Sequence, residues 1–141
     1  MRLARYLIIG LAFAGVAYWF VSGPPEKVAS TSDGATPLVE IILPDQLSDN
    51  ATIGKRAFEA KCAACHGINA VGQDGVAPPL VHKIYEPSHH GDESFQRAAA
   101  VGVRAHHWRF GDMPPVEGLT RAEVGMIVAY IRELQRTNGI N

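Results

Sequence analysis

The stretch Cys62-Ala63-Ala64-Cys65-His66 decides the fold of this chain. It contains both cysteines of the sequence, three positions apart, and a histidine follows the second cysteine directly. This C-x-x-C-H spacing is the signature of c-type haem attachment. Two thiols at this spacing can reach the two vinyl groups of the porphyrin, and the adjacent imidazole can reach the iron. We therefore expect one covalent haem c on Cys62 and Cys65, with His66 as an iron ligand.

The cysteine pair has two competing interpretations. A thioredoxin-like redox pair lies near a strand–helix–strand pattern, and no such pattern surrounds residues 62–66. A zinc or iron–sulfur site needs further ligands, and the sequence has no second cysteine pair. Haem attachment is therefore the favoured interpretation.

The stretch GDMPP at residues 111–115 supplies a candidate for the sixth iron ligand. It places Met113 in a proline-flanked loop just before the last expected helix. The other methionines are the initiator and Met126, which falls within that helix and is expected to pack. His106 and His107 are competitors that would give bis-histidine ligation.

Apolar spacing and capping residues predict a mainly helical domain. We expect one helix over Ala51–Ala63, a second over Asp92–Val101, and a third after the Thr120–Glu123 capping box. Asp92 should cap the second helix and Gly102 should stop it. The long loops between these helices need an organiser, and a haem would provide it.

Composition limits the remaining possibilities. The chain has 141 residues, of which 47% are hydrophobic and 19% are charged, enough for one compact domain plus extra segments. Its formal net charge of −1 argues against a nucleic-acid partner, because nucleic-acid-binding proteins usually carry a basic excess.

Residues 1–23 are predicted to form a single N-terminal membrane anchor. Tyr6–Val21 carries no charged residue, and Arg2 and Arg5 precede it. Counted from Tyr6 to Pro25 the uncharged run is 20 residues, long enough to span a bilayer, while a removed signal peptide is the alternative. The two arginines favour a cytoplasmic N-terminus and an exported remainder.

Residues 24–50 are rich in proline and acidic side chains, which predicts a flexible linker. As a random coil it would span roughly 30 Å. Leu38–Leu43 is the exception, because this apolar stretch can pack locally as a short strand. The folded domain is expected over residues 51–141.

These motifs together resemble class I (monohaem) c-type cytochromes in a membrane-anchored bacterial form, over about residues 51–141. The resemblance implies an all-α domain wrapped around one covalent haem, preceded by one transmembrane helix. It also implies that Gly54 and Phe58 on the first helix meet Ile127 and Tyr130 on the last.

A second part of the resemblance concerns Ala77-Pro78-Pro79-Leu80, which is similar to the Gly-Pro-x-Leu of that family. By this match the Pro78 carbonyl accepts a hydrogen bond from Nδ1 of His66, and Leu80 packs on the haem. Ala77 departs from the family's glycine.

The resemblance implies electron transfer rather than catalysis, because His66 and Met113 would close both axial positions of the iron. The expected partners are redox proteins of a membrane electron-transport chain such as a respiratory chain, with no small-molecule substrate. The expected location is the inner membrane, with one span and the haem domain in the periplasm. The alternative is a haem c subunit of a larger membrane oxidase, reductase or dehydrogenase, which would co-purify with its other subunits.

Several polar and aromatic residues have more than one possible role. Tyr85, Trp108 and Phe110 are candidates for the haem crevice, and Arg104 or Arg109 for a haem propionate. The five other histidines are His82, His89, His90, His106 and His107. They can contact propionates or backbone, remain solvated, bind a second metal ion, or tune the haem potential with pH. Adjacent histidines of an extended segment point to opposite sides, so we expect at most one of each pair in a shared site.

Mass spectrometry of the native protein tests the anchor. We expect residues 6–22 to be retained, because the uncharged run is longer than a typical signal core. A mature N-terminus that begins after residue 22 would instead identify a soluble periplasmic carrier.

Overall fold

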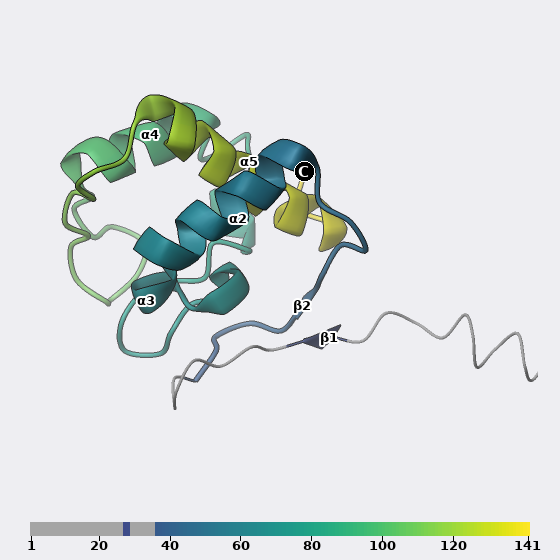
Figure 1. Cartoon of the computed structure of the whole chain (residues 1–141). Coiled ribbons are helices and arrows are strands. Elements are labelled where there is room, and N and C mark those ends of the chain that lie inside the picture. Colours follow the sequence, from purple (N-terminus) through teal and green to yellow (C-terminus); the bar gives the residue numbers. More distant parts are fainter. Residues whose placement is uncertain (1–26, 29–35) are drawn as a thin grey trace, which may run out of the picture.

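The computed structural model describes residues 27–28 and 36–141 (Figure 1). This part of the chain is mainly helical, in agreement with the expected all-α domain. Its elements are β1 (Lys27–Val28), β2 (Ile41–Ile42), α2 (Asp49–Lys61), α3 (Ala63–His66), the 3-10 turns η1 (Ile68–Ala70) and η2 (Lys83–Tyr85), α4 (Asp92–Val101) and α5 (Arg121–Thr137).

The predicted anchor over residues 1–23 lies outside the described residues. Among the helices of residues 36–141, none is long and apolar enough to span a bilayer.

The predicted helix over 51–63 is two helices in the structure. Ser48 caps α2, since its Oγ accepts a hydrogen bond from the backbone N–H of Ala51 at 3.3 Å. The helix ends at Lys61, and Cys62, at φ −119°, separates it from α3. The cysteine–histidine motif therefore occupies its own short helix at the end of α2.

Helix α4 has the predicted bounds, Asp92–Val101, but a different cap. The cap is Gly91, not Asp92, because the Asp92 carboxylate accepts a hydrogen bond from Nε of Arg132 at 2.9 Å. Gly102 ends the helix as expected, at φ +78°. The predicted Thr120–Glu123 capping box at the start of α5 is confirmed.

Helices α2 and α5 cross in close contact, which confirms the expected meeting of the first and last helices (Figure 1). A Cβ atom on Gly54 would lie only 1.8 Å from the backbone oxygen of Met126, so glycine is required there. One turn further, the buried rings of Phe58 and Tyr130 lie with centroids 5.7 Å apart. Ile127 belongs to the same buried cluster. This crossing forms the centre of the core.

Of the predicted linker, the structure describes residues 27–28 and 36–50, and the expected short strand within Leu38–Leu43 is present at Ile41–Ile42. Residues 36–50 pack on the domain. Ile41 is buried, and the strand β2 pairs with β1 in antiparallel register, Val28 opposite Ile41. The side chain of Asn138, at the end of α5, donates to the carbonyl of Ile42 and accepts from its N–H, at 2.8 and 2.7 Å. The apolar residues within Leu38–Leu43 outweigh the acidic composition around them, because they bury against the core.

The α2–α5 crossing predicts opposite effects for two helical glycines. Gly54→Ala should lower the free energy of unfolding by about 1–3 kcal/mol, since the added methyl meets backbone and the helices must separate. Gly125→Ala is the matched control, because the nearest atom to its Cβ is a side-chain nitrogen 3.8 Å away. Alanine there should stabilise by up to about 1 kcal/mol.

Denaturant unfolding of the haem-loaded protein measures both changes. Equal unfolding midpoints for Gly54→Ala and the wild type would show that the two helices do not meet at Gly54.

Candidate functional site

A single cavity brings together residues that are far apart in the sequence. It has a volume of about 550 Å³ and is lined by residues of α2, α3, α4, α5 and the intervening loops. All six residues singled out from the sequence line it: Cys62, Cys65, His66, Pro78, Leu80 and Met113.

The two thiols stand on either side of the start of α3. Cys62 is half-buried and Cys65 is exposed, and no disulfide joins them. Burial, with a smaller contribution from Cys65, raises the pKa of the Cys62 thiol to about 11. Both sulfurs are therefore free for bonds to a group in the cavity that they line.

The His66 ring is held in one orientation. It is buried, and its Nδ1 lies 2.9 Å from the carbonyl oxygen of Pro78. A carbonyl can only accept, so Nδ1 is the protonated nitrogen and Nε2 keeps its lone pair for a metal. Burial also lowers the pKa of His66, against an opposing effect of the Pro78 bond. The neutral imidazole that results is the form that binds iron.

The loop that carries Met113 is closed by backbone bonds at its two ends. Val103 and Met113 exchange two N–H···O=C hydrogen bonds of 2.9 Å each. Gly102 adjoins this pair, and a Cβ there would lie 2.4 Å from the Met113 carbonyl oxygen. The side chain of Asp112 accepts from the N–H of Ala105 at 2.8 Å. These contacts hold Met113 at the cavity wall.

Sequence reasoning missed Val103 and Asp112 as supports of this loop. The sequence feature that could have predicted this pairing is the presence of a glycine near each end of the loop. Gly102 and Gly111 both have positive φ, at +78° and +88°. Such a pair is typical of a chain that reverses sharply and pairs with itself.

The cavity walls fit a haem. Phe58, Leu80, Ile127 and Ile131 are buried apolar residues that line it, as a porphyrin requires. Trp108 and Phe110 also line it, stacked with ring centroids 5.8 Å apart.

A buried polar atom of the wall suits a haem propionate. The indole Nε1 of Trp108 is buried, and its side chain interacts with the Tyr85 hydroxyl. A propionate carboxylate is a stronger acceptor for this N–H than a phenol oxygen. Arg104 lines the cavity as well, whereas Arg109, the other arginine considered for a propionate, is not among the lining residues. The polar groups therefore agree with the same cofactor.

Comparison with known proteins agrees with this geometry. Residues 51–135 match a protein-family model described as Cytochrome c. No curated protein matches the chain. Proteins of that family bind haem c covalently and in general carry electrons between redox partner proteins. The predicted cofactor, haem c, is thereby confirmed, and so is the general role in haem-based electron transfer.

Serine variants test the two thiols as the attachment points. The double variant Cys62→Ser, Cys65→Ser should lose haem staining on a denaturing gel, because axial ligation alone does not survive unfolding. Each single variant keeps one thioether and should retain stain. The wild-type chain, matured in the same host, is the control. An unstained wild-type band of the right mass would contradict covalent attachment.

Proposed function

The chain belongs to the cytochrome c family, and we propose that it is a membrane-tethered electron carrier whose iron is held by His66 and Met113. One observation supports this pair of iron ligands. His66 lies on α3 and Met113 in the loop before α5, and the fold brings both residues to the same cavity. Met113 is also the one methionine among the lining residues of residues 36–141.

The bound haem supplies an iron that takes up and returns one electron. With His66 and Met113 both bound to the iron, no coordination position would stay open for a substrate. Transfer to a partner would then be outer-sphere, and the chain would act as a carrier rather than as an enzyme. The thioether of Met113 would raise the reduction potential.

The residues around the cavity support the same role. Buried Phe58, Leu80 and Ile131 exclude water from it, which lowers reorganisation during electron transfer. Cys65 is exposed and lines the cavity, so a haem bonded to it would be within reach of a redox partner on that side of the domain.

Tethering and location rest on the N-terminal sequence. The uncharged run from Tyr6 to Pro25, with Arg2 and Arg5 before it, supports one span with a cytoplasmic N-terminus. The haem domain then lies on the periplasmic side of the inner membrane, where bacterial haem c is attached. Residues 36–50 pack on the domain, so they are not part of the proposed tether.

Two methionine variants test the axial ligand. Met113→Leu keeps side-chain volume but removes the sulfur, so we expect a lower reduction potential and carbon monoxide binding by the reduced protein. Met126→Leu is the matched control, because Met126 lies on α5 and is not a lining residue. It should leave both properties unchanged.

An unchanged potential in Met113→Leu would assign the sixth position to another residue. His106 and His107 line the same cavity and are the next candidates.

A further inference from the structure

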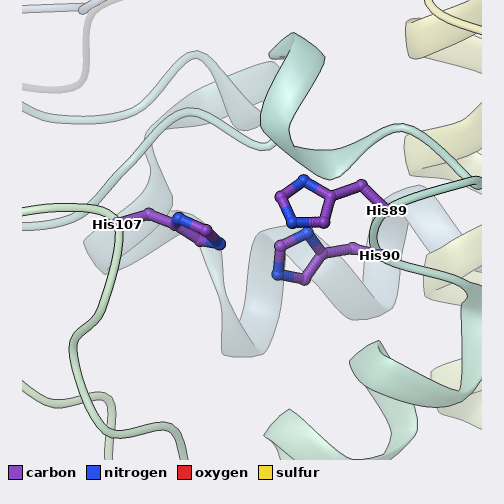
Figure 2. Close-up of side chains that lie close together, drawn as sticks. All are labelled: His89, His90 and His107. Carbon is purple, nitrogen blue, oxygen red and sulfur yellow. The ribbon is translucent and has the colours of Figure 1, made fainter.

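Three imidazoles converge beside the haem cavity. His89, His90 and His107 each offer a ring nitrogen, and these nitrogens all lie within 4.8 Å of one another. Figure 2 shows His107 on one side and the rings of His89 and His90 on the other, pointing toward it. None of the three is among the six residues assigned to the haem.

His89 and His90 face the same way because the chain turns there. Both of their backbone N–H groups donate to the carbonyl of Glu86, at 3.0 and 2.8 Å. Their ring centroids lie 4.6 Å apart. The expectation that at most one histidine of a pair joins a shared site is therefore wrong for this pair, since it assumed an extended segment.

The His90 ring is oriented by a second hydrogen bond. Its Nδ1 lies 2.6 Å from the carbonyl oxygen of Ile84, which can only accept. Nδ1 is therefore the protonated nitrogen, and Nε2 is left as a metal ligand. A second partner of this kind fixes tautomer and orientation at known metal sites.

The turn that carries the pair is anchored to α5. Arg132 is a buried residue of that helix, and its guanidinium donates to the carbonyls of His90 and Tyr85. It also donates to the Asp92 carboxylate at 2.9 Å. The turn is thus held from both ends, which positions the two rings before any ion binds.

His107 comes from the opposite loop, closed by the Val103–Met113 backbone pair. Its ring centroid lies 5.2 Å from those of both His89 and His90. His106 lies beside it, and its Nδ1 is engaged by the carbonyl of Arg104 at 2.8 Å. The turn that carries His89 and His90 and the loop that carries His107 thus bring their imidazoles together.

We propose that His89, His90 and His107 form a second metal site, which binds a divalent first-row transition ion such as Zn²⁺ or Cu²⁺. Imidazole nitrogen suits zinc, copper and nickel, whereas calcium and magnesium require oxygen ligands. Of these ions Cu²⁺ should bind most tightly.

The geometry needs only a small closure. Two nitrogens at about 2.1 Å from a tetrahedral ion lie about 3.4 Å apart. His89 and His107 are exposed, so their side chains can move by the ångström or so required. Three protein ligands leave a fourth position for water. His90 and His107 also line the haem cavity, so the ion lies at its mouth.

Metal titration of the haem-loaded full chain in detergent tests the site. Haem loading is essential, because the free Cys62, Cys65 and His66 would bind zinc themselves. After equilibrium dialysis against Zn²⁺, and separately against Cu²⁺, elemental analysis should find one added ion per iron. His89→Ala and His107→Ala should each weaken binding by at least about tenfold.

His82→Asn is the matched control. It removes an imidazole outside the cluster, and its amide oxygen can replace Nδ1 as the acceptor for the N–H of Ile84. It should bind as the wild type does. A wild type that takes up iron alone, or equal binding by His82→Asn, His89→Ala and His107→Ala, would overturn the proposal. Neither result would affect the electron-carrier proposal, which rests on the cavity and on Met113.

Discussion

The contact of Gly54 with the Met126 carbonyl is the constraint on which the rest of the structure depends. It brings α2 and α5 to the closest approach that two backbones allow. Helix α2 leads directly into α3, so the crossing places Cys65 and His66. Helix α5 carries Arg132 and Gln135, whose hydrogen bonds hold the 80–92 stretch. One helix contact therefore positions two separate segments that line the cavity.

The buried guanidinium of Arg132 holds the segment before α4 in place. Arg132 is 6% exposed, and desolvating a guanidinium is costly unless its donors are all used. It donates to Asp92, Gln135 and two backbone carbonyls, and it lies 5.0 Å from the centroid of the Phe95 ring. Gln135 in turn donates to the carbonyl of Leu80. This network costs desolvation but gives the turn before α4 one conformation, because any other would leave donors unpaired.

The sequence predicted those helix ends that are determined by residues only a few positions away. The α4 bounds and the α5 capping box were predictable, since a stop glycine and a reciprocal Thr120–Glu123 pair act within a few residues. The N-cap of α4 could not be predicted in this way, because Asp92 pairs with Arg132, which is far along the chain. The short strand within Leu38–Leu43 was predictable from its apolar residues, but its attachment to Asn138 was not, because composition carries no record of that partner. The C-x-x-C-H motif and Met113 could be located, but not the Val103–Met113 pairing that brings the loop back to the cavity.

The loop between Val103 and Met113 links the two proposed sites. Met113 stands at its end, at the cavity wall, and His107 stands within it, facing His89 and His90 (Figure 2). Because the loop is closed by its own backbone pair, a bond from Met113 to iron and a bond from His107 to a second ion restrain the same short segment. If both bonds form, each restraint would reduce the conformational freedom that the other must remove, and the two binding events would favour each other. Because such coupling is reciprocal, the second ion would then bind more tightly when Met113 is bound to the haem iron than when Met113 is not bound to it.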